Sequence, residues 1–358
     1  MNNVSFIISI DSSYEMTNNF FEELLKTNFA KESEMIIILD YVDNINILNY
    51  LNRLNRINHN ITIIDLDKKV GYGVANNIGV NASSNKYLFF INTDVFVDDV
   101  CLNKMLNTLE SNQADCVQPL LIWPQNNRIQ CAGSFFGPFY KNHLFAGRKA
   151  ESIDFGLIPI ERQALTSALY AMSKDTFNEY GKFDEFYYNK LESFELSVKL
   201  TLKGKKCVCL QDAIAYHSQG AGRNQYYFDF YQQEAYFWTN FGKRVTPDII
   251  DYYRYQTDEN MKEQIYVAIV ISQTRGVREL IDSMDFTISN YIEINGINPT
   301  KINLYDLLPY SIHYSELPLL FFVENIMNLL GNQKWFESRN AKDIVLDTYG
   351  NLLYIKDV

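Results

Sequence analysis

The most informative stretch of this chain reads Lys86-Tyr87-Leu88-Phe89-Phe90-Ile91-Asn92-Thr93-Asp94-Val95-Phe96-Val97. An apolar run of this length, bounded by polar residues, is typical of a buried strand. The run stops at Asp94, whose carboxylate would be costly inside a core. Open α/β sheets bind ligands in the crevice outside the carboxyl ends of their strands. We therefore expect Asp94 to hold a divalent cation against a diphosphate there, although an Asp at this point is as typical of a turn or a helix cap.

Strand and helix patterns alternate on both sides of this stretch. Compact β-branched runs at 4–10, 35–39 and 61–64 predict strands, and apolar residues at helical spacing over 45–57 predict an amphipathic helix. Further strands are expected at 115–122, 164–172 and 206–210. Such alternation indicates a mostly parallel sheet joined by crossover helices, an α/β fold.

The remaining segments are less regular. Residues 123–165 contain several Pro and Gly and predict a long loop, which is usually functional; we expect an acceptor or lid region there. Residues 225–242 are rich in Tyr, Phe and Gln and have helical spacing. A helix is expected over 276–289 and a terminal hairpin over 344–355, and Pro247 marks a plausible domain boundary.

Two glycines open the segment Gly71-Tyr72-Gly73-Val74-Ala75-Asn76-Asn77-Ile78-Gly79, which then becomes helical. Glycine lets a backbone approach a ligand closely, and a helix start offers free N–H groups to an anion. No Gly-Lys-Ser/Thr follows, so the segment is not a Walker loop, and its spacing after the first strand excludes a dinucleotide fingerprint. A plain turn fits the pattern equally well.

Two acidic residues and one histidine are further candidates. Glu192 and Glu195 share one face near a helix start, where they form either a solvated acidic turn or a carboxylate aimed at the mouth of the sheet. His217 follows an apolar run at 213–216. A single histidine at a strand end is usually structural, so His217 gains a role only if it meets Asp94 in space.

Composition restricts the function classes. The chain has 358 residues, enough for about two domains, and a net charge of −11, which argues against general affinity for nucleic acid. Its five cysteines are odd in number and widely spaced, unlike a disulfide framework. The amino terminus lacks signal-peptide features, and the apolar stretch 317–330 is too short to span a bilayer. We expect a cytoplasmic protein, at most peripheral at the inner face of the membrane.

Taken in order, these motifs over roughly residues 3–240 resemble the family 2 inverting glycosyltransferases, especially the rhamnosyl- and galactosyl-type enzymes of bacterial surface polysaccharide synthesis. Asp40 stands where the family reads the nucleotide base, and Gly71–Gly79 is similar to its Gly-Phe-Gly/Ala-x-x-Asn-x-Gly segment. Asn92-Thr93-Asp94 stands at its Asp-x-Asp or Asn-x-Asp metal motif. Gly181-Lys182-Phe183-Asp184-Glu185 resembles its Gly-Gly-Phe-Asp-Glu, and His217, followed by Gly220 and Gly222, stands at its metal-binding His.

The resemblance implies a GT-A nucleotide-sugar-binding fold over residues 1–244, with a mostly parallel mixed sheet flanked by helices. Residues 245–358 have no counterpart and are expected to form a smaller α+β accessory region. The implied site residues fall into two groups: donor-binding Asp11, Asp40, Gly71, Asn77, Asn92 and Asp94, and metal-binding Asp94 and His217. The implied cofactor is Mn²⁺ or Mg²⁺, held partly by oxygens of the substrate diphosphate.

The chain departs from the family at its catalytic base. The family commonly has Glu-Asp-x-Asp-Leu where this chain has Glu192-Ser193-Phe194-Glu195-Leu196, and a serine hydroxyl is not basic near neutral pH. Glu192 is the first candidate for the base and Glu195 the second. Ser193 also leaves open a catalytically lapsed binding or scaffold subunit for a partner transferase. A sugar nucleotidyltransferase is disfavoured, because Asp11-Ser12-Ser13 is not a basic glycine-rich loop.

The activity expected is that of a metal-dependent inverting hexosyltransferase in bacterial polysaccharide or glycoconjugate synthesis. The expected partners are a UDP- or dTDP-sugar donor and a saccharide or lipid-linked saccharide acceptor. The sequence leaves self-association and a partner transferase open.

Overall fold

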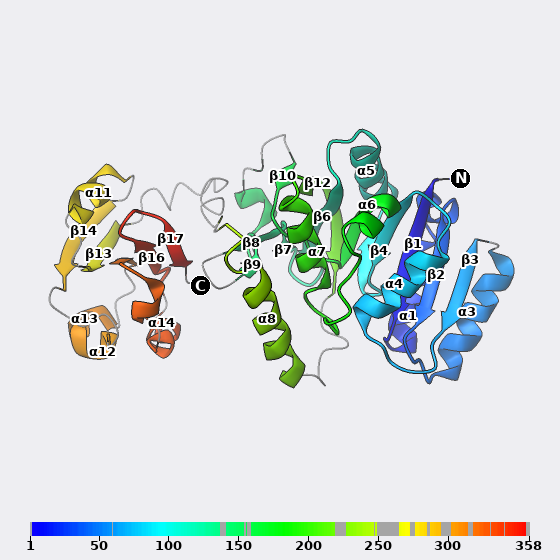
Figure 1. Ribbon diagram of the computed structural model, residues 1–358, viewed down its shortest axis with the longest axis horizontal. Coiled ribbons are helices and arrows are strands. Elements are labelled where there is room, and N and C mark those ends of the chain that lie inside the picture. Colours follow the sequence, from blue (N-terminus) through cyan, green and yellow to red (C-terminus); the bar gives the residue numbers. More distant parts are fainter. Residues whose placement is uncertain are drawn as a thin grey trace. The chain divides into compact units, whose positions relative to one another are not determined.

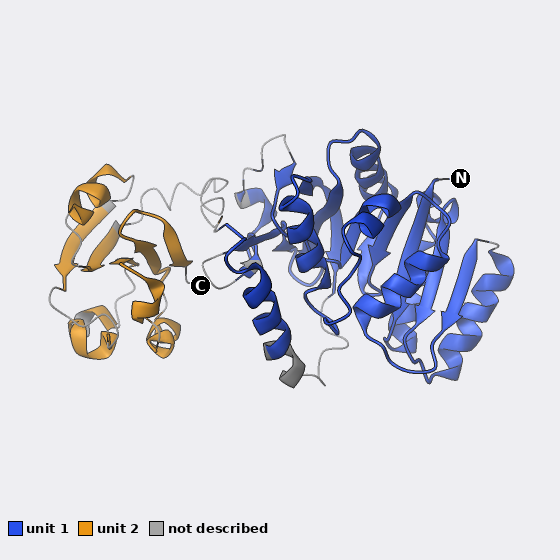
Figure 2. Ribbon diagram, viewed as in Figure 1, with its two compact units in different colours: residues 1–246 blue, residues 247–358 orange. Residues whose placement is uncertain are grey.

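A computed structural model of the protein describes residues 2–58, 60–136, 141–153, 155, 159–218, 227–246, 248, 265–272, 276–284, 287–294, 302–313, 318–329, 331–339 and 341–355 (Figure 1). Gly220 and Gly222 lie outside the described residues. The chain divides into two compact units, Met1–Thr246 and Pro247–Val358 (Figure 2).

A ten-stranded sheet forms the centre of the first unit, in the order β10-β12-β6-β11-β4-β1-β2-β3, with β5 paired to β12 and β7 to β6. The pairs β3–β2, β2–β1, β1–β4 and β6–β12 are parallel, whereas β11, β10, β5 and β7 pair antiparallel with their neighbours. A two-stranded ribbon, β8–β9, lies beside the sheet. The strands are β1 Val4–Ile10, β2 Glu34–Leu39, β3 Ile61–Asp65, β4 Tyr87–Ile91, β5 Val95–Val97, β6 Cys116–Trp123, β7 Arg128–Cys131, β8 Ser134–Phe136, β9 Lys141–His143, β10 Ile160–Glu161, β11 Leu169–Ser173 and β12 Cys207–His217.

Helices cover both faces of this sheet (Figure 1). They are α1 Tyr14–Leu24, α2 Asn28–Lys31, α3 Ile45–Ile57, α4 Tyr72–Ala82, α5 Asp99–Glu110, α6 Lys174–Glu179, α7 Glu192–Thr201 and α8 Tyr227–Phe241, with a short 3₁₀ helix at Ala150–Ser152. Alternate side chains of β1 point to opposite faces. Phe6 and Ile8 pack with residues of α1, α2, α3 and α5, whereas Ile7 packs with residues of α4, α6 and α7. The predicted α/β fold with a mostly parallel mixed sheet is confirmed.

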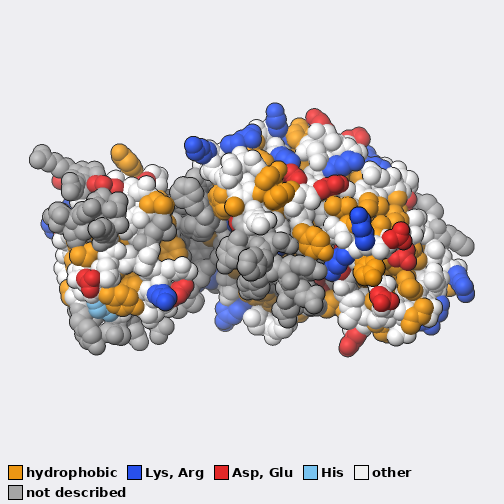
Figure 3. Space-filling view, turned by 60° about the horizontal axis from the view of Figure 1, so that its bottom comes forward, with side chains coloured by type: hydrophobic (Ala, Val, Ile, Leu, Met, Phe, Trp, Pro, Cys, Tyr) orange, Lys and Arg blue, Asp and Glu red, His pale blue; other side chains and the backbone are white. Residues whose placement is uncertain are grey.

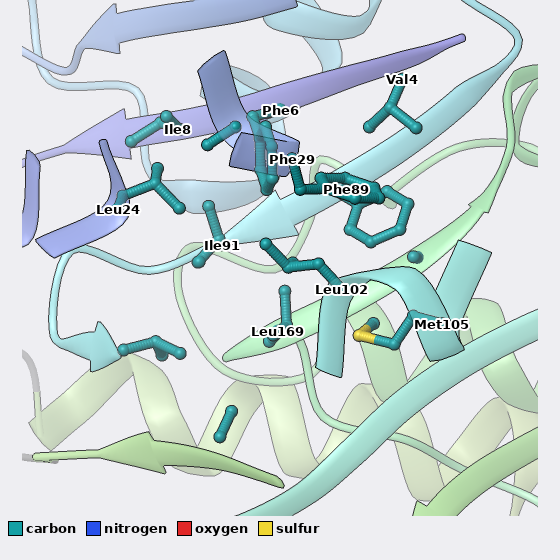
Figure 4. Close-up of a cluster of buried hydrophobic side chains, with 14 of the residues drawn as sticks. Val4, Phe6, Ile8, Leu24, Phe29, Phe89, Ile91, Leu102, Met105 and Leu169 are labelled. Carbon is teal, nitrogen blue, oxygen red and sulfur yellow. The ribbon is translucent and has the colours of Figure 1, made fainter. Parts of the chain in front are cut away.

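Aromatic side chains fill the core between β1, β4 and the helices that cover them (Figure 4). The ring centroids of Phe6, Phe29 and Phe89 lie 5.6 to 6.1 Å apart. Burying a side chain of this size contributes about 1.5–3 kcal/mol. This core holds β1 and β4 in register, so the polar residues that follow these strands are fixed in position.

Local sequence signals set several helix starts. The side chain of Asp98 accepts the N–H of Cys101 and caps α5, and Asn44 caps α3 in the same way. Two predictions need correction. Residues 123–165 are not a continuous loop in the described part, because β7, β8, β9 and β10 lie there; strands of two to four residues are too short to show alternation. The helix expected over 276–289 ends at Ser283, and a strand follows.

In the described part of the second unit, five strands form a sheet in the order β14-β13-β15-β16-β17. Its first four strands are parallel, and β17 pairs antiparallel with β16 as the predicted hairpin. The elements are β13 Ile265–Ile271, α11 Val277–Ser283, β14 Thr287–Glu293, α12 Leu304–Leu307, α13 Tyr310–His313, β15 Leu319–Val323, a 3₁₀ helix Ile326–Leu329, α14 Gln333–Ser338, β16 Ile344–Asp347 and β17 Leu352–Ile355. The expected small region of helices and strands is therefore present, and most of its sheet is parallel.

On the face of the molecule shown in Figure 3, the described Lys and Arg side chains are interspersed with Asp and Glu side chains. The five cysteines, Cys101, Cys116, Cys131, Cys207 and Cys209, are buried and unpaired. Among the described helices, none is long and apolar enough to cross a membrane.

Candidate active site

Polar residues follow three parallel strands at one edge of the first unit's sheet. Asp11 follows β1, Asp40 follows β2, and Asn92-Thr93-Asp94 follows β4. Because these strands are parallel neighbours, their carboxyl ends lie at the same edge. The first cavity of the unit opens there and is lined by Ser9, Asp11, Ser12, Met16, Asp40, Lys69, Gly71, Tyr72, Asn92, Thr93, Asp94, Tyr188, Asn189 and His217.

Asp94 and His217 meet in this cavity. His217 Nε2 lies 3.1 Å from Asp94 Oδ1. The backbone fixes the pair, because Val95 in β5 pairs with His217 in β12 and the N–H of Ser218 donates to the carbonyl of Asp94 at 2.9 Å. His217 is thus more than a histidine at a strand end, since its ring reaches the carboxylate of the Asn-Thr-Asp motif.

Asp40 organises the glycine segment. Its Oδ1 accepts the Val70 N–H at 2.6 Å, and its Oδ2 accepts the Gly71 N–H at 3.0 Å. Gly71 has φ +87°, a left-handed conformation that glycine adopts without strain. The N–H of Tyr72 then donates to the carbonyl of Tyr188 at 2.9 Å. The carboxylate therefore holds the loop before α4 at the wall of the cavity, while Asp40 itself remains part of the lining.

Asp11 lies at the mouth of the first cavity. Its carboxylate pairs with Lys69 Nζ at 3.3 Å, and both side chains are partly exposed. An exposed pair of this kind contributes at most about 1 kcal/mol, so an incoming charged ligand can replace either partner at low cost. Deeper in the cavity, Thr93 Oγ1 donates to Ser12 Oγ at 3.0 Å and links the two strand ends.

A second cavity adjoins the first, with a volume of about 300 Å³. It is lined by Tyr72, Asn92, Lys141, His143, Thr166, Ser167, Ala168, Asn189, Lys190, Glu192, Phe194 and His217. Tyr72, Asn92, Asn189 and His217 line both cavities, so the two form one continuous site. The second cavity receives Lys141 and His143 from β9, a strand that the sequence did not predict.

Glu192 is the carboxylate of the second cavity. It is buried at the start of α7, where its Oε2 accepts the Lys190 N–H at 2.9 Å. Its Oε1 has no hydrogen-bond partner among the described residues. Burial disfavours the charged form and raises the pKa of Glu192 to about 7. A carboxyl group with a free oxygen and such a pKa can accept a proton near neutral pH.

Glu195 and Ser193 do not line either cavity. Glu195 is buried, its Oε1 pairs with Lys199 Nζ one helical turn on, and the phenol of Tyr187 lies beside it. Burial raises the pKa of Glu195. Ser193 is also buried, and its carbonyl accepts the Ser197 hydroxyl. Of these three residues of the first turn of α7, Glu192 alone faces the site.

The donor atoms in the first cavity fit a divalent cation with few protein ligands. No group of three or more His, Cys, Asp or Glu side chains gathers around one point in the described part of the chain. Asp94 and His217 supply one carboxylate and one imidazole. Mg²⁺ and Mn²⁺ accept such donors and commonly complete their coordination with substrate phosphates and water.

Comparison with known proteins identifies the family. Residues 5–163 match the model of glycosyl transferase family 2. The match spans less than half of the 358 residues. The family 2 region carries the strand ends with Asp11, Asp40 and Asp94, whereas Glu192 and His217 lie beyond it.

One curated relative is the O-antigen biosynthesis protein RfbC of Myxococcus xanthus, which is 27% identical over 164 residues. The match covers 44% of this chain but only 13% of RfbC, so the chain corresponds to a small part of that protein.

Two solved structures support the GT-A fold of this protein. GalNAc-T7 with UDP, GalNAc and Mn²⁺ has a TM-score of 0.54 and 14% identity, over 67% of this chain and 49% of that one. Mannosyltransferase PcManGT from Pyrobaculum calidifontis, in complex with GDP-Man and Mn²⁺, has a TM-score of 0.50 and 9% identity, over 69% of this chain and 66% of that one. At these identities the likeness establishes the fold alone.

One residue of the family 2 glycine segment lies away from the site. Asn77, expected to bind the donor, is not among the described residues that line either cavity. Its Nδ2 donates to the Phe183 carbonyl at 2.9 Å, and its Oδ1 accepts the Phe183 N–H at 3.2 Å. Both amide atoms are thus used to clamp α4 to the segment that leads into α7.

Sequence reasoning missed several lining residues, including Tyr188, Asn189, Lys190, Lys141 and His143. Tyr188 to Lys190 lie two to four residues before Glu192, so their closeness in sequence to a candidate base was a usable signal. Lys141 and His143 offered no local signal, because β9 is too short to recognise and reaches the site only by pairing with β8.

Proposed function

We propose that this protein transfers a sugar from a nucleoside diphosphate donor to a saccharide hydroxyl, with inversion at the anomeric carbon. The proposed setting is bacterial surface polysaccharide or glycoconjugate synthesis, in line with the name of the relative from Myxococcus xanthus. The observation that carries the proposal is the joint lining of one continuous site by Asp94, His217 and Glu192. Residues 1–244 carry out the transfer, and residues 245–358 form an accessory region.

The first cavity takes the donor, with the diphosphate beside Asp94 and the nucleoside toward Asp40 and Gly71. Asp94 and His217 hold Mn²⁺ or Mg²⁺, and Asn92 and Asp11 complete the polar wall. When bound, the cation neutralises charge on the departing diphosphate. The two structural neighbours contain Mn²⁺ with UDP or with GDP-Man, which supports a nucleotide-sugar donor and a divalent cation here.

The second cavity takes the acceptor. Glu192 removes the proton from the attacking hydroxyl, a contribution of about 10²–10⁴ in rate for a well-placed base. Its position in the lining of the second cavity and its pKa of about 7 support this assignment. Glu195 is disfavoured because it lines neither described cavity and its Oε1 pairs with Lys199 Nζ. Inversion requires the acceptor hydroxyl to attack the anomeric carbon from the face opposite the departing diphosphate.

The test is incubation of the full chain with Mn²⁺ and a panel of nucleotide sugars and saccharide acceptors. Release of nucleoside diphosphate and a product of inverted anomeric configuration, read by nuclear magnetic resonance, are expected. Absence of release together with absence of nucleotide binding by calorimetry would reject the proposal.

A binding or scaffold subunit is distinguished by the same assay. Such a protein would bind the nucleotide sugar without releasing diphosphate, and Glu192→Gln would leave its properties unchanged. The buried Ser193, which replaces the acidic residue of the family, does not by itself favour that alternative, because Glu192 supplies a carboxylate to the second cavity.

A further inference from the structure

Gln130 lies at an irregularity in the sheet next to the site. In the pairing of β6 with β7, Leu121 pairs with Cys131 and Ile122 with Ile129, so the register shifts at Gln130. This is a β-bulge, a feature that redirects a side chain and is frequent beside active sites. Gln130 is buried, so its amide must find partners inside the protein.

The amide of Gln130 contacts His217 at two points. Its Oε1 lies 2.6 Å from His217 Nδ1, and its Nε2 lies 3.5 Å from the backbone carbonyl oxygen of His217. A carbonyl oxygen only accepts, so the amide nitrogen faces the backbone and the amide oxygen faces the ring. The short contact with Nδ1 then requires the ring hydrogen to be on Nδ1.

This hydrogen position decides what the other ring nitrogen can do. With the hydrogen on Nδ1, the neutral ring presents a lone pair at Nε2, directed at Asp94 Oδ1 3.1 Å away. Two electron pairs facing each other at that distance repel, and a cation bound by both relieves the repulsion. With the hydrogen on Nε2 instead, the ring would donate to Asp94 and could not bind a cation.

We propose that Gln130 is a positioning residue that fixes the ring hydrogen of His217 on Nδ1 and so keeps Nε2 available as a cation ligand. The role rests on the proposed function, since the cation site belongs to it. Substitution of a residue that hydrogen-bonds the second ring nitrogen of a metal-binding histidine typically lowers metal affinity by about 10–100-fold. Gln130 itself is not a cation ligand in this proposal, and the sequence analysis assigned it no role.

The first test measures Mn²⁺ affinity by the electron paramagnetic resonance signal of free Mn²⁺, without and with UDP. Gln130→Met, which keeps the length but removes the acceptor, should weaken binding by about 10–100-fold. Gln130→Glu keeps an oxygen that accepts from Nδ1 but loses the donor to the His217 carbonyl, so it should retain more Mn²⁺ affinity than Gln130→Met. The matched control is Gln118→Met: Gln118 is also buried, but its Oε1 accepts the Thr166 N–H at 2.9 Å.

The second test reads the ring directly, through long-range ¹H–¹⁵N spectra of the metal-free full chain above pH 8, with His217→Ala to assign the signal. We expect the hydrogen on Nδ1 in the wild type and on Nε2 in Gln130→Met. If Gln130→Met weakened Mn²⁺ binding only by disturbing the buried packing, Gln118→Met should weaken it as well. Such a packing defect would not move the hydrogen from Nδ1 to Nε2 of His217.

The outcomes separate the two proposals. If wild type binds Mn²⁺ and Gln130→Met binds it equally well, or if the wild-type ring carries its hydrogen on Nε2, the role of Gln130 is rejected and the proposed function stands. If wild type binds no Mn²⁺ in either condition, the cation site itself is rejected, and the positioning role with it.

Discussion

Gly71 packs against the backbone of Tyr188 so closely that a Cβ at position 71 would lie 2.5 Å from the Tyr188 carbonyl oxygen. Real Cβ atoms do not approach an oxygen that closely, and the same oxygen accepts the Tyr72 N–H. The contact joins the loop before α4 to the segment before α7. It therefore ties the wall of the first cavity to the residues that precede Glu192.

Gly71→Ala should disturb this contact between the two segments. The substitution combines an unfavourable φ with a backbone clash, so the loop must move, and affinity for UDP should fall by about tenfold or more, which corresponds to ~1.4 kcal/mol. Gly204→Ala is the matched control: Gly204 also has positive φ, +77°, but a Cβ there meets nothing within 4 Å. It should cost about 1–2 kcal/mol of unfolding free energy and leave UDP binding unchanged. Calorimetry and urea unfolding give both values, and equal UDP affinities for the two variants would contradict the role of the contact.

Glu192→Gln should remove most of the transfer activity. Loss of the base should lower kcat by about 10²–10⁴-fold, while affinity for the nucleotide should persist because Glu192 is not part of the first cavity. Glu195→Gln is the matched control, and its effect on kcat should be small. If Glu195→Gln lowered kcat more than Glu192→Gln, the base would be Glu195 instead.

The rate should rise with pH through the pKa of the base. Glu192 must be deprotonated to accept the hydroxyl proton, and its pKa is about 7. Below that value kcat should therefore increase about tenfold per pH unit, with a plateau above it. A rate that is constant between pH 5.5 and 8 would argue against Glu192 as the base, and the profile of Glu195→Gln should match that of wild type.

The stability of the protein should respond to pH in the opposite sense. Burial raises the pKa of Glu192 from 4.5 to about 7, so between these values the folded state binds more protons than the unfolded state. Stability is then lost as pH rises, by on the order of 3 kcal/mol once pH exceeds 7. Glu192→Gln has no charge to desolvate and should be more stable than wild type at pH 8. The difference in unfolding free energy should shrink at pH 5; an equal difference at both values would contradict the prediction.

Asp94→Asn should weaken the cation site. Loss of a direct ligand should lower Mn²⁺ affinity at least as much as loss of a residue that only supports a ligand. Mn²⁺ affinity should therefore fall by about 100-fold or more, and the Mn²⁺-dependent part of nucleotide binding should fall with it. Asp212→Asn is a control on an exposed carboxylate of β12, which pairs with Lys104 at 2.8 Å. Its Mn²⁺ affinity should equal that of wild type. If Asp94→Asn bound Mn²⁺ as tightly as wild type, the assignment of Asp94 as a cation ligand would be rejected.

The sequence by itself determined the α/β class with a mostly parallel sheet and the approximate position of the site. Buried β-branched runs alternating with amphipathic helices indicated parallel strands, whose carboxyl ends share an edge. Asp11, Asp40, Asn92 and Asp94 follow such runs, so their common lining of the first cavity could be expected before any coordinates.

Only the tertiary structure decided between residues with the same local signal. Glu192 and Glu195 look alike in sequence, but the packing of α7 turns one to the second cavity and the other to Lys199. Asn77 lies in a donor-binding pattern, yet a segment distant in sequence engages its amide. Gln130 gave no signal at all, because its bulge depends on the pairing of β6 with β7. Local spacing fixes which residues form a strand or a helix, whereas the direction of a buried polar side chain depends on partners that only the folded chain brings within reach.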